Sequence, residues 1–466
     1  MKRSRIAVVG GGITGLSAAY YLHREAELRS LPLDLALIEG EERLGGKVKT
    51  KRIDGFVMET GPDSFLERKN SAKQLALDLG LKDDLVRNRT GQSFILHQGR
   101  LLPIPEGAVM GIPTRLTPFL RTGLFSASGK LRAAQDLILP KQKEKMDVSV
   151  GAFFRRRLGD EVVDHLIEPL LSGIYAGDLD RLSLKATFPQ FAQMEQEHRS
   201  LILATRKSRP PRKKGNRSRG QFLTLKQGLE SLVETIEAKL PKETVITGNP
   251  VQRIIKEANR YLLVLRSGRV IQADAVITAV PFQVMKRLLP AGELPEYPTS
   301  VSATSVATVI LGYDREALPE GVDGTGFVIP RKEETTITAC TWTHKKWPHT
   351  APEGKALIRC YVGRFGNDAI VEETDSRILD RVCSDLRKIQ GIEAMPTFTH
   401  ITRWQKSMPQ YAVGHVDWLK RLEETCRDQL PGFFPVGASY SGIGIPDCID
   451  QGKQSVQDTL HYLGYR

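Results

Sequence analysis

The chain of 466 residues is about three times a typical domain of roughly 150 residues, so we expect two or three domains with full hydrophobic cores. Hydrophobic residues make up 40% and charged residues 26%, which excludes a disordered, collagen-like or repeat-dominated chain. The net charge of +13 favours an anionic partner, although eight of the basic residues are concentrated between Arg206 and Arg219.

Cysteine usage and hydropathy bear on the compartment. The five cysteines are never closer than twenty residues, so they indicate neither a zinc site nor a disulfide framework and favour a reducing compartment. The basic start followed by Ile6-Ala-Val-Val imitates a secretion signal, but the glycines that come next argue against one. No apolar run approaches the roughly 18 residues of a spanning helix, so we expect a cytoplasmic protein with at most peripheral membrane contact.

The predicted elements begin with a strand, a helix and a second strand over residues 5–39. Residues 92–205 read as mostly helical, with helical stretches at 129–139 and 151–172 and frequent Pro and Gly between them. The other predictions are a solvated basic loop over 206–220, a helix over 222–240, a hairpin and strand over 260–279, a strand-rich region over 301–365, a helix over 376–390, and a strand, glycine turn and helix over 430–466.

A glycine-rich turn joins the first predicted strand to the first predicted helix. Gly10-Gly11-Gly12-Ile13-Thr14-Gly15 fits the G-x-G-x-x-G pattern, in which glycines allow a tight turn, close approach to a pyrophosphate and close helix packing. The helix amino terminus then faces the phosphate charge. Glu39 ends the second strand, where a carboxylate can accept hydrogen bonds from ribose hydroxyls. The pattern predicts an ADP-ribose site, and a turn without a ligand is the alternative.

Further glycine turns favour FAD over NAD. Arg43-Leu44-Gly45-Gly46-Lys47 follows Glu39 closely, and Glu59-Thr60-Gly61-Pro62-Asp63 forms another predicted turn. Far along the chain, a predicted strand leads into Gly442-Ile443-Gly444-Ile445-Pro446 and a helix. A second helix amino terminus would suit the distal, electron-rich end of a ligand much longer than ADP-ribose.

These motifs resemble those of the FAD-dependent amine oxidase, phytoene desaturase and protoporphyrinogen oxidase superfamily. A closer resemblance, to the Gram-positive HemY-type coproporphyrinogen III and protoporphyrinogen oxidases, rests on residues 61–69, 169–178, 341–348 and 404–415. The similarity covers nearly the whole chain and departs mainly in the basic loop.

The resemblance implies an α/β fold with a discontinuous, Rossmann-like FAD-binding domain formed by residues 1–66, 221–290 and 402–466. A strand-rich substrate-binding domain would comprise residues 67–91, 187–220 and 291–401, and residues 92–186 would form a helical, membrane-binding-like lobe. Some relatives attach flavin through a cysteine upstream of the carboxyl-terminal turn, but residues 404–414 contain none. We therefore expect the FAD to be non-covalent.

The resemblance also implies an oxidoreductase reaction, the six-electron oxidation of a porphyrinogen in haem biosynthesis. Hydride would pass from a meso carbon to the flavin N5, and molecular oxygen would reoxidise the flavin. We expect no catalytic side chain, because the cofactor performs the difficult step and the protein holds the substrate against it. Coproporphyrinogen III is the expected substrate, with protoporphyrinogen IX second, and a haem-pathway ferrochelatase is a candidate partner.

Five residues match substrate positions of the family. Lys69 matches the place where relatives put a cation for a propionate, with a solvated lysine as the alternative. Ile174, Gly326, Val328 and Tyr361 match the walls of the substrate slot, with ordinary core packing as the alternative. Gly326 is the most specific of the four, because a glycine within a strand often marks close approach of another backbone.

Twenty residues are expected to contact the cofactor. Within this set, Val251 resembles the family's backbone contact to the adenine, and Trp404 resembles a residue packed near the flavin. The set is Gly10, Gly11, Gly12, Ile13, Thr14, Gly15, Glu39, Arg43, Gly46, Lys47, Gly61, Pro62, Asp63, Ser64, Val251, Trp404, Gly437, Ile443, Gly444 and Ile445.

Other functions find less support in the sequence. The nine histidines show no metal-ligand spacing and no nucleophile elbow is present, so neither a metal site nor a hydrolase is expected. The basic loop lacks interleaved aromatic residues, so nucleic-acid binding is not expected. Two alternatives stay open: an amine oxidase or carotenoid desaturase, and a non-catalytic flavoprotein acting in porphyrin transfer.

Overall fold

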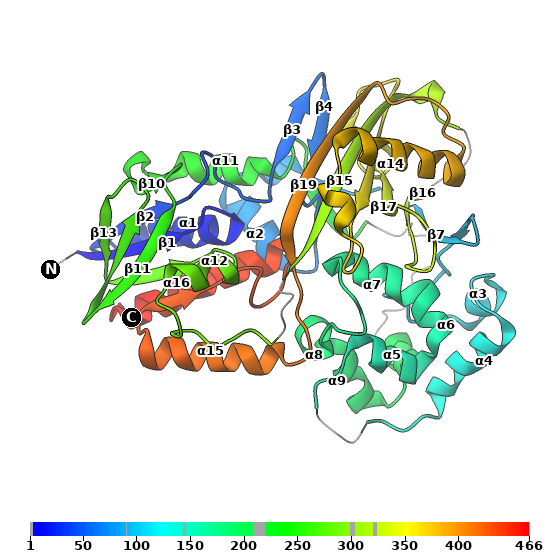
Figure 1. Cartoon of the computed structure of the whole chain (residues 1–466), viewed down its shortest axis with the longest axis horizontal. Helices are drawn as coiled ribbons and strands as arrows, with labels where there is room; N and C mark the ends of the chain where they lie inside the picture. Colours follow the sequence, from blue (N-terminus) through cyan, green and yellow to red (C-terminus); the bar gives the residue numbers. More distant parts are fainter. Residues whose placement is uncertain are drawn as a thin grey trace.

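Two sheet-based parts and a helical part make up the chain, and segments far apart in sequence lie side by side in each sheet (Figure 1). The computed structural model describes residues 3–89, 91–142, 146–207, 220–298, 303–319 and 324–465. The predicted basic loop falls mostly outside the described residues, and its first two residues, Arg206 and Lys207, end a helix.

The first part is built on a five-stranded parallel sheet in the order β10-β2-β1-β14-β20. Its central strand, β1, is apolar and buried from Ile6 onward, as expected for a parallel strand covered on both faces. The predicted strand, helix and strand over residues 5–39 are confirmed. The strands are β1 (Ser4–Val9), β2 (Leu33–Ile38), β10 (Val245–Ile246), β14 (Ala275–Thr278) and β20 (Phe433–Pro435).

Helices cover one face of this sheet, and a small sheet with two helices covers the other, giving a Rossmann-like three-layer arrangement (Figure 1). The first layer contains α1 (Ile13–Leu28), α2 (Asn70–Asp78), α11 (Glu230–Lys239) and α16 (Ile445–Tyr462). The other layer contains the antiparallel strands β11 (Val251–Glu257), β12 (Arg260–Leu265) and β13 (Val270–Ala273), with α12 (Phe282–Leu288) and α15 (His415–Gln429).

The second part is a seven-stranded sheet in the order β19-β15-β18-β17-β16-β7-β8. The neighbouring strands are antiparallel except for the parallel pair β16 and β7. Helix α14 (Asp375–Gln390), predicted over 376–390, packs on one face through Ile378, Val382 and Leu386. The strands are β7 (Gln92–His97), β8 (Arg100–Pro103), β15 (Ala303–Asp314), β16 (Gly324–Val328), β17 (Ile337–Trp342), β18 (Lys355–Val362) and β19 (Phe398–Pro409).

Two expected segment boundaries cut across this sheet. Residues 92–103 were expected at the start of the helical segment 92–186, but they form β7 and β8 at one edge of the sheet. The short apolar run of Phe94, Ile95 and Leu96 suits a buried strand, and the Pro-rich stretch after it obscured that signal. At the other edge, β19 spans the expected boundary at residue 402 and pairs with β15 along its length.

The helical part lies below the seven-stranded sheet in Figure 1 and has its own apolar core. The helices predicted within 129–139 and 151–172 are present, and residues 163–167 form a π-helical turn. The helices are α3 (Leu116–Arg121), α4 (Ala127–Ala134), α5 (Val150–Leu158), α6 (Asp160–Val162), α7 (Glu168–Tyr175), α8 (Leu184–Thr187), α9 (Pro189–His198) and α10 (Leu201–Lys207).

Two small sheets connect the first two parts. They are the hairpin β3 (Thr50–Ile53) and β4 (Phe56–Glu59), and the sheet of β5 (Phe65–Leu66), β9 (Phe222–Leu225) and β6 (Leu85–Arg87). The prediction of a helix over 222–240 is therefore wrong for its first part, because residues 222–225 pair with two strands distant in sequence. Only Glu230–Lys239 is helical there.

Short helical turns complete the fold, including α13 (Thr343–Lys346) between β17 and β18. The 3₁₀ turns are Lys82–Asp84, Gln135–Leu137, Lys242–Thr244, Arg315–Ala317, Pro348–Thr350 and Ala369–Glu372. Across the described ranges, no helix has both the length and the apolar character needed to cross a bilayer. The expected mixed α/β fold is confirmed.

Candidate active site at the meeting of two glycine turns and a sheet face

The turn between β1 and α1 has the geometry that its glycines predict. Gly10 has a φ of +102°, which L side chains rarely adopt. A Cβ on Gly15 would overlap the Gly10 carbonyl oxygen, so this glycine serves helix packing. A Cβ on Gly12 would meet nothing within 4 Å, so this residue presents open space at the start of α1. The geometry predicted for Gly10 and Gly15 is present, and Gly12 leaves space for a ligand at the start of α1.

Glu39 lies beside this turn at the end of β2. One carboxylate oxygen accepts a hydrogen bond from the Gly11 amide at 2.6 Å, and the other accepts one from the Glu41 amide at 2.9 Å. Two bonds from the backbone fix the orientation of the carboxylate next to the glycine turn. The Asn249 amide also donates to the Glu39 carbonyl oxygen. Val251, which opens β11, follows Asn249 by two residues, so the start of β11 lies near Glu39.

The turn over residues 43–47 packs directly against the first one. The Gly45 amide donates to the Gly11 carbonyl oxygen at 2.8 Å, and a Cβ on Gly46 would lie 3.3 Å from the Gly12 Cα. Arg43 donates to the carbonyl oxygen of Gly46 and forms an ion pair with Glu230 at 3.1 Å. Its guanidinium therefore holds the turn in place.

The two helix amino termini lie side by side, although their residues are more than 420 positions apart. Gly452 of α16 approaches Thr14 of α1 so closely that a Cβ on Gly452 would lie 2.5 Å from the Thr14 carbonyl oxygen. A Cβ on Gly437 would lie 3.6 Å from the Thr14 hydroxyl, and Thr14 also hydrogen-bonds the Cys448 side chain. The amino-terminal and carboxyl-terminal glycine turns thus form one continuous site.

This combined turn fits a dinucleotide by its chemistry. Helices α1 and α16 begin at Gly12 and Gly444, and neither cap position supplies a side chain to the first amides. Such amides, with the positive end of the helix dipole, favour anionic or electron-rich groups. Lys47 adds a cation that donates to the Ser407 carbonyl oxygen, and burial lowers its pKa. An extended anionic cofactor can therefore be held from Glu39 to Ile445.

The turn over residues 60–64 is held by side chains of the seven-stranded sheet and of α13. The Thr60 carbonyl oxygen accepts bonds from Trp404 Nε1 and from the Thr308 hydroxyl, both at 2.9 Å. Lys346 donates to Asp63 at 2.8 Å, and Ser64 donates to the other Asp63 oxygen at 2.7 Å. Pro62 lies between these anchored residues. Trp404 therefore acts on this turn through a hydrogen bond.

Two neighbouring cations keep the Asp63 carboxyl ionised. Burial raises the pKa of this carboxyl, but Lys346 and Arg359 lower it by more, so its pKa lies well below the usual range. An ionised carboxylate with three donors around it, including Trp347 Nε1 at 3.4 Å, is a rigid anchor for the turn.

Three of the expected substrate residues lie on one face of the seven-stranded sheet. Val328 and Tyr361 are both aligned with Ala339, from opposite sides, and Gly326 is two residues from Val328. Laterally aligned residues share a face, and so do residues two apart in a strand. Thr308, aligned with Tyr361 on β15, shares this face and contacts Thr60. The face therefore looks toward the turn over residues 60–64.

Gly326 is required by the packing of its own strand against β17. Its φ is +148°, and a Cβ would overlap the Cys340 carbonyl oxygen of β17. The close backbone approach predicted at this glycine is present, but the approaching backbone is the neighbouring strand. A side chain here would break the sheet regardless of any ligand.

The other wall residues lie between the sheet and the helical part. Ile174 is on α7 and is 44% exposed, which makes it an accessible apolar side chain and not core. Val328 and Ile443 are both half-buried and pack against the apolar core of the helical part. An apolar boundary thus runs from the carboxyl-terminal glycine turn to the sheet face.

Lys69 lies at the start of α2 and pairs with an acid that the sequence did not single out. Its ammonium group contacts both carboxylate oxygens of Asp447, in the first turn of α16. The Lys69 side chain is 43% exposed and the Asp447 side chain 26% exposed. The lysine therefore lies at the edge of the site, and its positive charge is paired with the Asp447 carboxylate.

Two further residues at the site were missed because their partners are distant in sequence. The Tyr411 hydroxyl donates to the Ala438 carbonyl oxygen at 2.7 Å and accepts from the Gly442 amide at 3.0 Å. Arg359 donates to the Gly61 carbonyl oxygen and lies 4.8 Å from the centre of the Tyr361 ring. The sequence offered only indirect signals: Tyr411 falls within the segment 404–415 that carries the family resemblance, and Arg359 precedes Tyr361 by two residues.

Comparison with known proteins identifies the family. The sequence matches the family model "Flavin containing amine oxidoreductase" over residues 13–460. The chain belongs to this family. Membership in the flavin-containing amine oxidoreductase family implies a flavin cofactor, which agrees with the fit of the joined glycine turns.

Relatives within the family cover the chain from end to end. It is 51% identical to coproporphyrinogen III oxidase of Bacillus subtilis (strain 168), over 99% of both chains, and 41% identical to the enzyme of that name from Staphylococcus aureus, over 98% of this chain and 99% of the relative. The predicted resemblance to HemY-type oxidases is thereby confirmed.

Solved structures agree with the similarity to these oxidases. A protoporphyrinogen oxidase structure from Exiguobacterium sp. 255-15 superposes with a TM-score of 0.89 at 42% identity, over 100% of both chains. A reduced UDP-galactopyranose mutase superposes with a TM-score of 0.73 at 16% identity, over 99% of this chain and 96% of the other, which shows the shared fold alone.

Proposed function

We propose that this chain is an FAD-dependent oxidase that converts coproporphyrinogen III to coproporphyrin III in haem biosynthesis, with protoporphyrinogen IX as a second substrate. The observation that carries the proposal is the end-to-end match, at 51% identity, to the Bacillus subtilis coproporphyrinogen III oxidase. The anionic tetracarboxylate substrate also suits a protein with a net charge of +13.

FAD is the flavin that the joined turns favour. Glu39 and Val251 would hold the adenosine end, residues 10–15 and 43–47 the pyrophosphate, and residues 60–64 with 437–445 the ring. Gly12 opens toward the ligand, which suits close approach of a phosphate. When bound, FAD would accept hydride equivalents from the substrate, with molecular oxygen as the final acceptor.

The chain's cysteines favour a non-covalent cofactor. Cys448 lies at the site, in the first turn of α16. Burial raises the pKa of its thiol to about 11, so it stays protonated and is a poor nucleophile. The flavin is therefore expected to leave the protein on denaturation.

Side chains of this chain would bind and orient the substrate. Val328, Tyr361 and Ile174 would form an apolar slot, with Gly326 shaping the strand behind it. Burial of the porphyrinogen against these residues would exclude water and hold one meso carbon toward the cofactor. Lys69 would attract a propionate at the edge of the slot, in competition with Asp447.

Partners and location follow from the same proposal. The product would pass to a haem-pathway ferrochelatase in the cytoplasm. Peripheral membrane contact is supported by Leu116, Leu120, Leu131 and Ile138 of the helical part, which are 55–75% exposed. Flotation with anionic vesicles tests this contact, and a fourfold substitution of these residues by serine is expected to abolish it.

One experiment separates the proposed activity from its alternatives. The purified protein is denatured and the released cofactor analysed, which is expected to give FAD. The native protein is then mixed anaerobically with coproporphyrinogen III, protoporphyrinogen IX or putrescine. Rapid flavin bleaching with coproporphyrinogen III, followed by porphyrin fluorescence on admission of air, is expected. Bleaching by putrescine alone would indicate an amine oxidase, and no bleaching by any of the three would contradict the proposal.

A further inference from the structure

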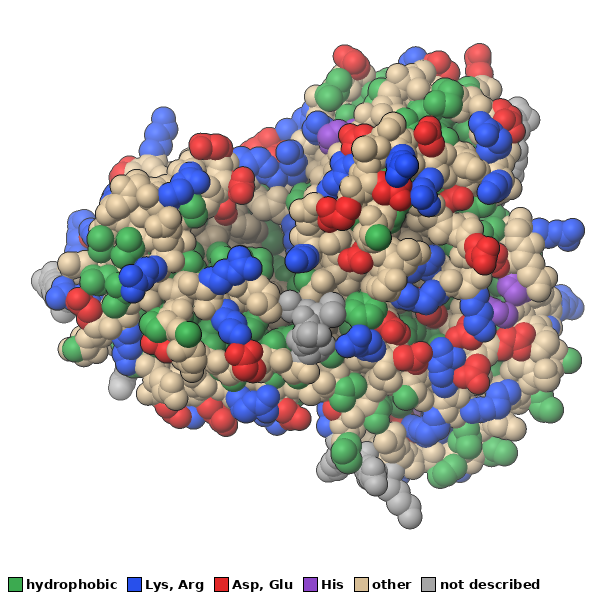
Figure 2. Space-filling model, viewed as in Figure 1, with side chains coloured by type: hydrophobic (Ala, Val, Ile, Leu, Met, Phe, Trp, Pro, Cys, Tyr) green, Lys and Arg blue, Asp and Glu red, His purple; other side chains and the backbone are tan. Residues whose placement is uncertain are grey.

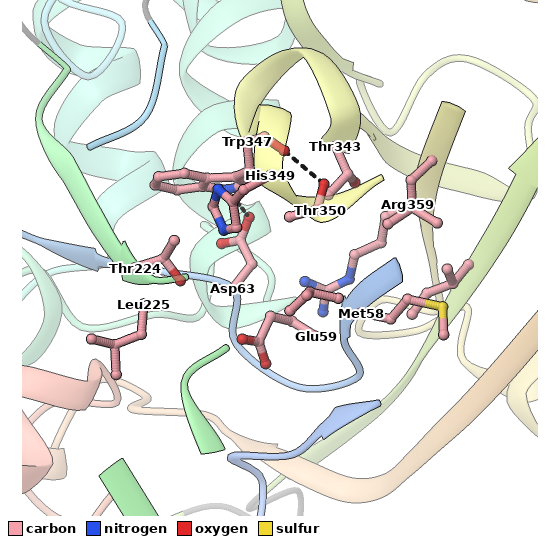
Figure 3. A pocket seen from close by; sticks show the side chains of 13 residues that line it. Met58, Glu59, Asp63, Thr224, Leu225, Thr343, Trp347, His349, Thr350 and Arg359 are labelled. Atoms are coloured by element: carbon pink, nitrogen blue, oxygen red, sulfur yellow. Dashed lines mark hydrogen bonds between the residues drawn. The ribbon is translucent and has the colours of Figure 1, made fainter. Parts of the chain in front are cut away.

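Behind the turn over residues 60–64 lies a small cavity with an unusual lining (Figure 3). The space open to the centre of a water molecule is about 20 Å³. Among apolar neighbours, its polar lining includes Glu59, Asp63, Thr224, Thr343, His349, Thr350 and Arg359. Since one water needs roughly 10–15 Å³ measured in this way, the cavity has room for one or two.

The donors in this cavity exceed the bonds that they make. Arg359 is 4% exposed, and its Nη2 donates to the Gly61 carbonyl oxygen. Its Nε and Nη1 atoms are also buried, yet neither has a hydrogen-bond partner among the described residues. Figure 3 shows the guanidinium extending from β18 into the space between Glu59 and Asp63. Leaving two nitrogen atoms of a buried guanidinium without any acceptor would be costly, so a partner is required.

An acceptor in the same cavity is also unsatisfied. The His349 ring hydrogen-bonds the Leu225 backbone, and its buried Nε2 has no partner in the described part of the chain. Burial lowers the pKa of His349 and so favours the neutral ring, in which a nitrogen that carries no proton accepts a hydrogen bond. Residues with unused donors and with an unused acceptor line one small cavity, and a bridging water can satisfy such groups.

We propose that this cavity is a site for ordered water and that Arg359 is a positioning residue, which fixes the turn over residues 60–64 through the Gly61 carbonyl oxygen and through that water. The guanidinium also lies against the Tyr361 ring, so the same residue fixes the proposed substrate wall. Arg359 touches neither substrate nor cofactor in this assignment.

The test compares variants of the full-length protein. Arg359→Met keeps an apolar stem and removes every donor, whereas Arg359→Lys restores one cation and rescues part of the effect. Arg403→Met is the matched control, because Arg403 also donates to two loop carbonyl oxygens, those of Val371 and Glu373, but does not contact this turn. The first readout is amide hydrogen exchange over residues 60–66 in cofactor-free protein, which does not depend on the proposed activity.

Arg359→Met is expected to speed exchange of these amides at least about tenfold, as the loss of charged hydrogen bonds predicts, while Arg403→Met leaves them unchanged. FAD affinity is expected to fall with Arg359→Met and to recover partly with Arg359→Lys. Unchanged exchange in a folded Arg359→Met protein would overturn the positioning role.

A second measurement remains decisive even if that variant does not fold. A crystal structure of the unmutated protein at high resolution should show water within hydrogen-bond distance of Arg359 Nε or Nη1 and of His349 Nε2. A dry cavity, or an Arg359 side chain turned to pair directly with Glu59, would overturn the water site.

Discussion

The Lys69 ammonium group lies 2.6 and 2.7 Å from the two carboxylate oxygens of Asp447. The pair joins the start of α2 to the first turn of α16, at the edge of the proposed substrate slot. A cation already paired with an acid can still attract a propionate, but the acid competes for it.

Removing either partner therefore has opposite effects on substrate binding. Lys69→Met is expected to lower kcat/KM for coproporphyrinogen III about tenfold, the order expected for loss of a charged hydrogen bond, with FAD content unchanged. Asp447→Asn is expected to keep or lower KM, because it frees the lysine. Steady-state kinetics of both variants check the pair. Equal losses in both variants would mean that the pair matters only for structure, and unchanged kinetics in Lys69→Met would remove Lys69 from the site.

Tyr411 offers a test of the carboxyl-terminal turn. Tyr411→Phe removes two hydrogen bonds, to Ala438 and from Gly442, while keeping the ring in its core. The affinity for FAD is expected to fall about tenfold, since each such bond contributes roughly 1 kcal/mol. Fluorescence titration of cofactor-free protein measures this affinity. Tyr20→Phe, which removes one bond to Asp78, is the control and should bind FAD normally.

The glycines of the first turn separate cofactor binding from folding. Gly12→Ala adds a Cβ in open space at a φ of −69°, so cofactor-free stability should stay the same while FAD affinity falls more than about tenfold. Gly15→Ala should instead destabilise the cofactor-free protein by about 1–3 kcal/mol, because its Cβ overlaps the Gly10 carbonyl oxygen. Thermal unfolding and FAD titration check both variants. Normal FAD binding by Gly12→Ala would contradict the pyrophosphate assignment.

Glu59 predicts a pH dependence of stability. Burial raises the pKa of this carboxyl to about 7, although bonds from Leu229 and Thr50 oppose the shift. Because the folded state binds this proton more tightly than the unfolded chain, the stabilising effect of protonation is fully present below the unfolded pKa and is lost as pH rises to about 7. Glu59→Gln cannot ionise, so the variant does not lose this stability as the pH rises.

The variant should therefore be more stable than the unmutated protein at pH 8, by a few kcal/mol at most, and the difference should shrink toward pH 5. Denaturant unfolding of cofactor-free protein at several pH values measures it. A stability difference that is independent of pH would contradict the raised pKa.

Local patterns predicted the parts of the site whose chemistry is contiguous in sequence. The strand, glycine turn and helix around Gly12 and the carboxyl-terminal turn could be predicted because turn residues and apolar periodicity are local signals. Strand β9 could not, because its four residues, three of them apolar, read equally well as the start of a helix until β5 and β6 pair with the strand. Arg359 and Tyr411 became meaningful only when tertiary contacts supplied their partners.

Gly326 shows that a correct local signal need not identify its cause. The sequence indicated close backbone approach at this strand glycine, and the structure has it, with the Cys340 carbonyl oxygen of the next strand as the neighbour. Sequence alone gives no means to tell a neighbouring strand from a ligand.

The order of strands in the five-stranded sheet constrains when the protein can mature. β1 pairs with β14, about 270 residues later, and β14 pairs with β20 at residues 433–435. Helix α16, which supplies the second helix terminus, follows still later and packs on α1. A nascent chain therefore lacks the second helix terminus of the proposed dinucleotide site until residues near 450 have emerged from the ribosome, and we expect translation products that end before α16 to carry no flavin.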